Sequence, residues 1–320
     1  MPARYQTHYP RELGPEFKPQ VRQDWREKLE TQKAEIVLMG DSVLREGIDP
    51  SQFKALTGEE PLYVAIPGSS SALWYAIIKN NIAVSTHQPR YLFLFFRDTM
   101  LTTPDYRVTG KYFTMLDEFA SPDDTLIVQY AYINSMNWIE KLLEQYVPLY
   151  GNRTDLRNSI EYRLKYTLPF RLLRCGEVCV DQAIANVFAD EKMAFILKER
   201  AVSEAEDYLY ENKNLDFNNQ VSRSFLPEII RTLQEKNVQL VLVQVKTTRF
   251  RSGNRPFLLN KYLADLQQYA IAHNVLYLSF SDNKRLKDAY FVDQIHLSDE
   301  GKEVFTTLFS EAIKPIIDTP

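Results

Sequence analysis

Apolar residues are concentrated in five short runs, separated by longer segments in which they recur at three- and four-residue intervals. The runs lie at residues 35–39, 62–66, 91–96, 238–245 and 275–280. The run at 91–96 shows no polar alternation, as expected for a strand whose sheet is covered by helices on both faces. The three- and four-residue spacing between the runs predicts helices. We therefore expect a three-layer α/β/α protein with a five-stranded parallel sheet.

The flavodoxin-like strand order 2-1-3-4-5 is the most plausible order for such a chain. In this order the first and third strands flank the switch point, and ligands bind outside the carboxyl ends of the strands there. Two serine sites look like helix caps, because a serine hydroxyl accepts hydrogen bonds from the first turn of a helix. The Ser69–Ser71 cluster precedes a helix expected from about Ala72, and Ser298 precedes the last helix.

Residues 105–219 interrupt the alternation of strands and helices. Their apolar residues have helical spacing without a convincing strand, as at Trp138, Leu142, Leu143, Leu168, Leu172, Leu173, Phe188, Phe195, Ile196 and Leu197. A segment of this length is too long for an ordinary connection. We expect an N-terminal arm and helix at 1–33, an α/β domain formed by 34–104 and 220–320, and a mostly helical insertion at 105–219 between the third and fourth strands.

Composition limits the classes of partner. Hydrophobic residues make up 45% of the 320 residues, which is enough for a large core. A formal net charge of −4 and the lack of a dense Lys/Arg cluster argue against a nucleic-acid partner. No apolar run reaches membrane-spanning length and the start has no signal-like apolar core, so the chain as written is expected to be soluble. A removed leader or anchor is compatible with this pattern.

Cys175 and Cys179 are four positions apart in a segment with a helix-like pattern. A disulfide at this spacing is expected to be strained, and two thiols without a nearby histidine pair make a poor metal site. We therefore expect two partly buried thiols.

A candidate nucleophile follows the first strand. Ser42 ends the tripeptide Gly40-Asp41-Ser42, and a serine attacks a carbonyl when a base takes its proton and an acid orients that base. Of the four histidines, His296 alone follows the last strand, and Asp293 precedes it by three residues. One turn can therefore let Asp293 hold Nδ1 while Nε2 faces Ser42. Taken singly, Ser42 as a helix cap and His296 as a helix-start residue are the alternatives.

The order of these motifs resembles the GDSL/SGNH hydrolase superfamily. It consists of Gly40-Asp41-Ser42 near the start, Gly68 after the second strand and Asp293-x-x-His296 near the end. A Gly-x-Ser-x-Gly motif is absent, which disfavours the ordinary α/β-hydrolase fold. The resemblance implies Ser42 as nucleophile, His296 as base, Asp293 as orienting acid, and the N–H groups of Ser42 and Gly68 as oxyanion donors. It implies neither a metal nor a cofactor.

One position departs from the family pattern. The family usually has an asparagine after the third strand as a further oxyanion donor, whereas this chain has Phe95-Phe96-Arg97-Asp98. Arg97 could donate to an oxyanion or hold an anionic substrate. Equally, it could pair with Asp98 or with a carboxylate of the insertion and have a structural role, and the sequence leaves both roles open.

A looser resemblance concerns the stretch from Gly40 to Pro50 and the large insertion. Both are similar to bacterial cell-envelope proteins that modify polysaccharides or teichoic acids. This implies an extracytoplasmic location, an acylated carbohydrate substrate, and a membrane-bound acyltransferase as partner. We therefore expect a serine-dependent acyl-ester hydrolase or O-acyltransferase. The alternatives are a lipid esterase or thioesterase with an acyl tunnel, and a non-catalytic protein that uses the crevice to hold a polysaccharide or a membrane partner. Two features together would favour the non-catalytic protein: Ser42 and His296 out of hydrogen-bonding reach, and Arg97 salt-bridged away from the crevice.

Overall fold

The computed structural model describes residues 9–151, 160, 163–167, 174–180, 207–250 and 255–318. The chain divides into two compact units. Unit 1 comprises Met1–Pro15 and Tyr132–Tyr208, and unit 2 comprises Glu16–Ala131 and Leu209–Pro320. All of the residues proposed for the site from the sequence fall in unit 2.

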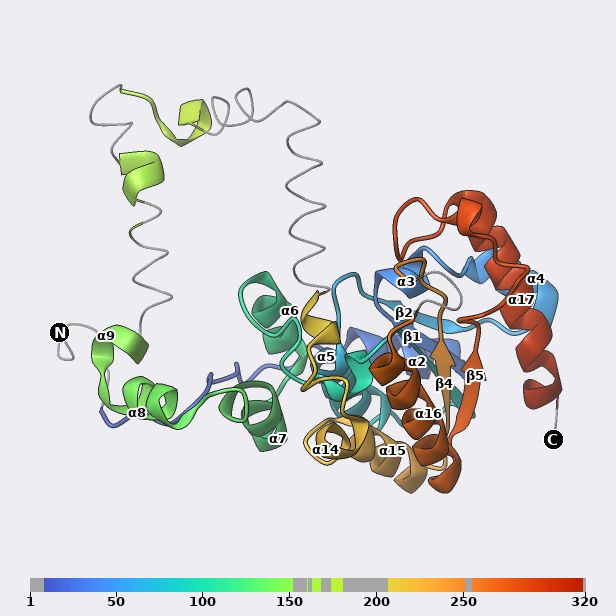
Figure 1. Ribbon diagram of the computed structural model, residues 1–320, viewed down its shortest axis with the longest axis horizontal. Coiled ribbons are helices and arrows are strands. Elements are labelled where there is room, and N and C mark those ends of the chain that lie inside the picture. The colour runs from blue at the N-terminus through green and yellow to red at the C-terminus, as the bar shows by residue number, and fades with distance from the viewer. Residues whose placement is uncertain are drawn as a thin grey trace. The chain divides into compact units, whose positions relative to one another are not determined.

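Unit 2 is built around a five-stranded parallel sheet (Figure 1). Its strands are β1 (Ile36–Gly40), β2 (Leu62–Ala65), β3 (Tyr91–Phe96), β4 (Gln239–Gln244) and β5 (Leu276–Ser279). The order is β2-β1-β3-β4-β5, which confirms the predicted topology. The third strand has the predicted bounds, and the other four differ from them by at most one residue at either end.

Helices connect the strands and cover the sheet. The α-helices of unit 2 are α2 (Asp24–Gln32), α3 (Ser42–Arg45), α4 (Pro50–Thr57), α5 (Ser71–Ile77), α6 (Lys111–Phe119), α7 (Thr125–Ile127), α14 (Phe217–Val221), α15 (Leu226–Glu235), α16 (Phe257–Ala272) and α17 (Asp299–Ile317). Unit 1 contains α8 (Trp138–Tyr146) and α9 (Pro148–Gly151). The π-helical turns are η1 (Ile78–Ile82), η3 (Val128–Ile133) and η4 (Arg163–Thr167), and the 3₁₀ turns are η2 (Met100–Thr102), η5 (Tyr208–Tyr210) and η6 (Asp288–Tyr290).

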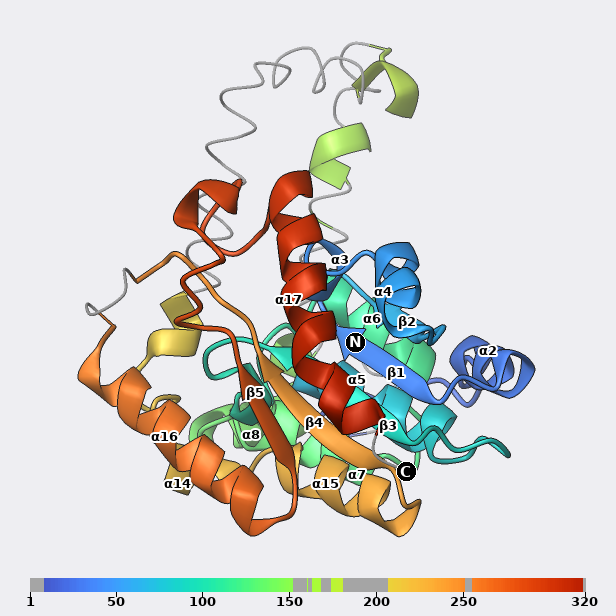
Figure 2. The same ribbon diagram turned by 90° about the vertical axis from the view of Figure 1, so that its right-hand side faces the viewer.

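Aromatic side chains fill the core on one face of the sheet. Figure 2 shows α17 running across this face. The ring of Phe309 in α17 lies 4.9 Å from that of Phe95 in β3 and 5.9 Å from that of Phe53 in α4. In Figure 1, α5, α15 and α16 lie on the opposite side of the sheet. The two helical layers explain why β1 is buried at all five positions and β3 at five of its six.

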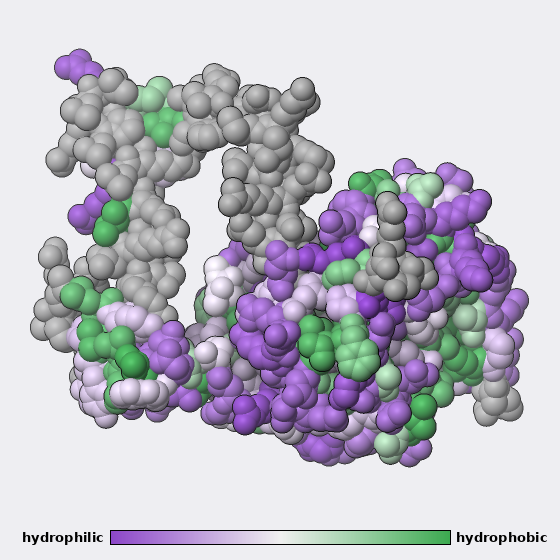
Figure 3. Space-filling view, in the orientation of Figure 1, coloured by the Kyte–Doolittle hydropathy of each residue, from purple (hydrophilic) through white to green (hydrophobic). Residues whose placement is uncertain are grey.

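The described residues between 105 and 219 contain helices and no strand. The bounds of the insertion stay a prediction. Within the described ranges, no helix is long and apolar enough to cross a membrane. Figure 3 shows a mostly hydrophilic surface on the visible face of unit 2, whereas α8 of unit 1 exposes Trp138, Ile139 and Leu142. The predicted helical residues Leu168, Leu172, Leu173, Phe188, Phe195, Ile196 and Leu197 lie outside the described part of the chain.

Two local predictions were wrong. Cys175 and Cys179 form a disulfide with a Cα–Cα distance of 5.4 Å, because the turn between them brings their backbones within bridging range. Ser70 is the N-cap residue of α5, but its side chain does not cap the helix. Its hydroxyl donates instead to the carbonyl of Tyr106 at 2.7 Å. Ser298 does cap α17, accepting a hydrogen bond from the N–H of Gly301.

Candidate active site

The end of β1 turns sharply to present Ser42. A Cβ atom at Gly40 would lie 2.9 Å from Cβ of Leu44 and 3.1 Å from Cβ of Phe95, so the turn requires a glycine here. Asp41 then caps α3, since its Oδ1 accepts from the N–H of Val43 at 3.0 Å. Ser42 is the first residue of α3 and is half-buried. Its N–H belongs to the first helical turn, where backbone donors have no intrahelical acceptor.

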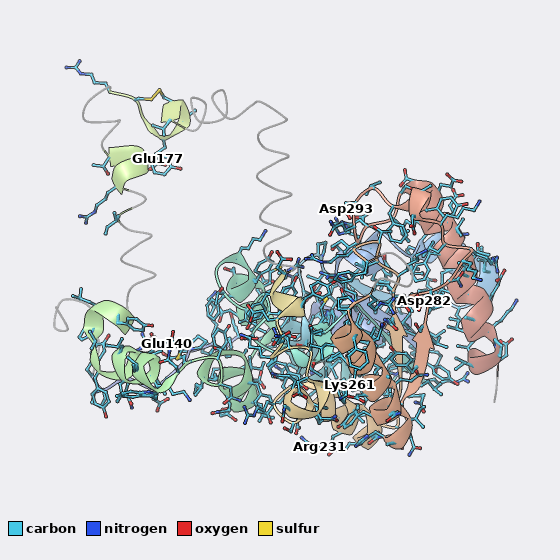
Figure 4. The ribbon with its side chains drawn as sticks, viewed as in Figure 1. Glu140, Glu177, Arg231, Lys261, Asp282 and Asp293 are labelled. Carbon is cyan, nitrogen blue, oxygen red and sulfur yellow. A yellow bond between two sulfur atoms is a disulfide. The ribbon has the colours of Figure 1, made fainter. Side chains whose placement is uncertain are left out.

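The loop between β5 and α17 presents the other two candidate residues. A bridge between Phe291 and Leu297 closes this loop, and the N–H of Val292 donates to the carbonyl of His296 at 2.9 Å. Within it, Oδ1 of Asp293 accepts from the backbone N–H groups of Ile295 and His296, each at 2.8 Å. These bonds hold the turn in place independently of the His296 side chain. Figure 4 labels Asp293 on this loop.

Ser42, His296 and Asp293 form a continuous chain of hydrogen bonds. Nε2 of His296 lies 2.8 Å from Oγ of Ser42, and Nδ1 lies 2.7 Å from Oδ2 of Asp293. An ionised carboxylate only accepts hydrogen bonds, so Nδ1 carries the proton and Nε2 accepts from the serine hydroxyl. This is the geometry that the three-residue spacing predicted. The contact between Ser42 and His296 is contrary to one of the two features that would favour a non-catalytic protein.

The environment of Asp293 favours its charged form. Burial acts to raise the pKa of this carboxyl, but hydrogen bonds from the His296 imidazole and from the N–H groups of Ile295 and His296 together outweigh it. They lower the pKa from 3.8 to about 2. The side chains of Asp293 and His296 are 44% and 23% exposed, so a substrate can approach the imidazole from solvent.

Gly68 lies beside the nucleophile turn. The N–H of Ile66 and the hydroxyl of Ser69 both donate to the carbonyl of Gly40, at 3.0 and 3.2 Å, which joins the loops after β1 and β2. Gly68 has φ +82°, and a Cβ atom there would lie 2.8 Å from Cε1 of Tyr112. Backbone conformation and space therefore both require glycine. That its N–H donates to an oxyanion stays a prediction.

Arg97 is completely buried. Its Nη1 lies 3.6 Å from Oδ2 of Asp98, which corresponds to the structural alternative that the sequence left open. Asp98 is also hydrogen-bonded to the phenol of Tyr210, whose pKa is raised by burial first and by the Asp98 carboxylate second. The Arg97 side chain is thus part of a buried polar cluster with Asp98 and Tyr210. A direct role of Arg97 at an oxyanion stays a prediction.

The sequence did not single out Arg107, a second arginine near the site. Its Nη1 lies 3.9 Å from Oδ2 of Asp41, the residue before the candidate nucleophile. Arg107 follows the third strand by eleven residues, in the stretch assigned to the insertion. No motif marked it, because its relation to Asp41 exists only in the folded chain.

Among the described residues, no group of three or more His, Cys, Asp or Glu side chains is arranged to hold a metal ion. The groups that the structure brings together at the site are the Ser42 hydroxyl, the His296 imidazole and the Asp293 carboxylate.

Comparison with known proteins adds distant structural likenesses. No protein-family model and no curated protein matches the chain. A protein from Bacteroides fragilis assigned as an acylhydrolase is 14% identical, with a TM-score of 0.41 over 92% of this chain and 100% of its own. A GDSL-like lipase from Bacteroides thetaiotaomicron is 13% identical, with a TM-score of 0.37 over 91% and 98%. A lipase/acylhydrolase from Enterococcus faecalis is 12% identical, with a TM-score of 0.36 over 88% and 95%. At these identities and TM-scores, we draw no conclusion about activity from them.

Proposed function

We propose that this protein is a serine-dependent acyl-ester hydrolase of the SGNH type. The observation that carries the proposal is the hydrogen-bonded chain from Ser42 Oγ through the His296 imidazole to Asp293, which joins the ends of the first and last strands. A serine that donates to an imidazole, with an acid on the opposite ring nitrogen, is the arrangement that nucleophilic acyl transfer needs. The loop that contains Gly68 is hydrogen-bonded to the carbonyl of Gly40, two residues before this serine, which supports an oxyanion hole formed by backbone N–H groups.

The acylation step follows from the geometry. Ser42 Oγ attacks the ester carbonyl carbon as its proton passes to Nε2 of His296. The electron pair of the carbonyl moves to its oxygen, which the N–H groups of Ser42 and Gly68 receive. When the tetrahedral intermediate collapses, the bond to the alcohol oxygen breaks and the imidazolium gives that oxygen its proton. Asp293 stabilises the imidazolium throughout, and an acyl-serine remains.

Deacylation reverses the roles with a new nucleophile. Water loses a proton to Nε2 and attacks the acyl carbon, and the proton then returns to Ser42 Oγ as the carboxylic acid leaves. A sugar hydroxyl in place of water would produce a new ester by the same steps. O-acyl transfer therefore needs no additional residue, only an acceptor that competes with water.

For the substrate, we propose an acylated carbohydrate of the cell envelope, with a membrane-bound acyltransferase as partner, as the looser sequence resemblance implies. The Cys175–Cys179 disulfide supports a location outside the cytoplasm, because disulfides persist in oxidising compartments. The net charge of −4 supports a partner other than nucleic acid.

A panel of acyl esters tests this proposal. It comprises 4-nitrophenyl esters of acetate and decanoate together with acetylated oligosaccharides, and the protein is expected to prefer the short acyl group and release acetate from the sugars. Ser42→Ala should abolish hydrolysis. Ser281→Ala is a matched control, because its hydroxyl bonds near neighbours in the chain, Ser279 at the end of β5 and Asp282 in the loop after it. A preference for decanoate would favour the lipid esterase, and equal rates for wild type and Ser42→Ala would contradict the proposal.

A further inference from the structure

The residue before the nucleophile is a buried carboxylate that lies near an arginine. Asp41 is fully buried, and its Oδ1 is used in capping α3. Its Oδ2 accepts no hydrogen bond from the described residues and lies 3.9 Å from Nη1 of Arg107. A buried charge of this kind is costly unless an opposite charge compensates it. Within the described ranges, the Arg107 guanidinium is the cation that lies near Asp41 Oδ2.

Arg107 is held firmly in position. Its backbone has φ +56°, a left-handed conformation that is uncommon for a residue with a side chain. The preceding carbonyl, that of Tyr106, accepts the hydroxyl of Ser70 at 2.7 Å. The guanidinium carbon lies 4.9 Å from the ring centroid of Tyr106 and 5.6 Å from that of Tyr112. Two aromatic faces, an ion pair and an anchored backbone therefore restrict one side chain.

The same guanidinium connects both predicted oxyanion donors. On one side it faces Asp41, which caps the first turn of α3 where the Ser42 N–H lies. On the other side it contacts the ring of Tyr112, and the Cε1 atom of that ring lies where a Cβ on Gly68 would collide. A displacement of Arg107 would therefore affect the loop after β1 and the loop after β2 together.

We propose that Arg107 is a positioning residue of the oxyanion hole. It compensates the charge of Asp41 and so keeps the cap on the N–H of Val43, which sets the direction of the first turn of α3. Through Tyr112 it also supports the loop that contains Gly68. It acts on these groups without contacting the substrate. It holds the two backbone donors in position in a chain that lacks the asparagine found after the third strand in the family. This inference rests on the proposed function.

Kinetics of Arg107→Gln and Arg107→Lys separate positioning from substrate binding. A misplaced donor weakens transition-state stabilisation, so Arg107→Gln is expected to lower kcat about 10- to 100-fold, less than the loss of a whole donor, with KM within a factor of about three. Arg107→Lys should recover part of the loss. The affinity of a trifluoromethyl ketone, which forms an oxyanion adduct with serine, should fall in parallel. Arg231→Gln is the matched control, because Arg231, which is labelled in Figure 4, lies on the surface of α15. It forms ion pairs with Glu228 and Glu235.

A double-mutant cycle tests the route through Asp41. Asp41→Asn and Arg107→Gln should be strongly non-additive, with the double variant about as slow as the slower single variant. If the fold losses in kcat of the two single variants multiply in the double variant, the inference is wrong. It is also wrong if Arg107→Gln has a wild-type kcat or changes KM alone.

Hydrogen exchange gives a readout that does not depend on activity. Exchange of the Val43 amide, measured by NMR, should accelerate at least about tenfold in Arg107→Gln at unchanged global stability, because the cap loosens locally. Unchanged exchange would overturn the inference. If wild type hydrolyses no ester, the proposed function fails, and the Val43 exchange rate then decides only whether Arg107 keeps the cap on α3 in place.

Discussion

Nε2 of His296 lies 2.8 Å from Oγ of Ser42, although 254 positions separate the two residues in the chain. The contact exists because the parallel sheet brings the loops after its strands to one edge. Each partner is fixed by its own local bonds, Ser42 by the capped turn of α3 and His296 by the turn around Asp293. The site is therefore assembled from two turns that each have their own hydrogen bonds.

Asp293→Asn should reduce kcat by roughly 10²- to 10⁴-fold with little change in KM. An amide can donate to Nδ1, which would move the imidazole proton to Nε2, where it no longer accepts from Ser42. Steady-state kinetics with an acetyl ester check this. Asp282→Asn is the control, because Asp282 is an exposed partner of Arg255 (labelled in Figure 4). A variant Asp293→Asn with wild-type kcat would remove Asp293 from the mechanism.

The contribution of Asp293 to stability should depend on pH with a defined sign. Its folded-state pKa of about 2 lies below the ordinary 3.8, so the folded state stabilises the carboxylate. That stabilisation is complete above the unfolded-state pKa and is lost as pH falls through the folded-state value. The difference in unfolding free energy between wild type and Asp293→Asn should therefore shrink as pH falls from about 4 towards 2, measured by urea unfolding. A difference independent of pH would contradict this assignment.

Gly68→Ala should impair both stability and catalysis. The left-handed φ costs a residue with a side chain about 1–2 kcal/mol, and the added Cβ would collide with Tyr112. Gly58→Ala is a matched control, because Gly58 also has φ +82° but nothing within 4 Å of an added Cβ. Both variants should lose stability, while kcat falls at least about tenfold in Gly68→Ala alone. Equal kcat values in the two variants would argue against an oxyanion role for Gly68.

The two cysteines should resist alkylation until they are reduced. Iodoacetamide should add no mass to the native or urea-unfolded protein and two carbamidomethyl groups after reduction, because both thiols are in the Cys175–Cys179 disulfide. The double variant with serine at both positions should retain esterase activity, since the disulfide lies in unit 1 and the site in unit 2. Labelling without reduction would show free thiols.

Much of the fold follows from local apolar pattern. The buried strands can be recognised in the sequence as continuous apolar runs, because helices cover both faces of the sheet. The run of β3 is an example. The positions of Ser42 and His296 also followed, because a parallel sheet places the residues after its strands at one edge. Asp293 was identified by spacing alone.

The remaining features depend on contacts between distant segments. Ser70 was expected to cap a helix, but the carbonyl of Tyr106 competes successfully for its hydroxyl. Arg107 could not be recognised, since its significance comes from a buried carboxylate in another loop. The Cys175–Cys179 disulfide depends on the local turn, which a count of residues between cysteines does not reveal.

The central claim is that Ser42 is the nucleophile, and covalent labelling with a fluorophosphonate tests it most directly. Intact-mass measurement and peptide mapping should show one phosphonyl group per chain, located on Ser42, with slower labelling in His296→Ala and none in Ser42→Ala. Wild-type protein that hydrolyses acyl esters but takes no label, or takes it at another residue, would contradict the account.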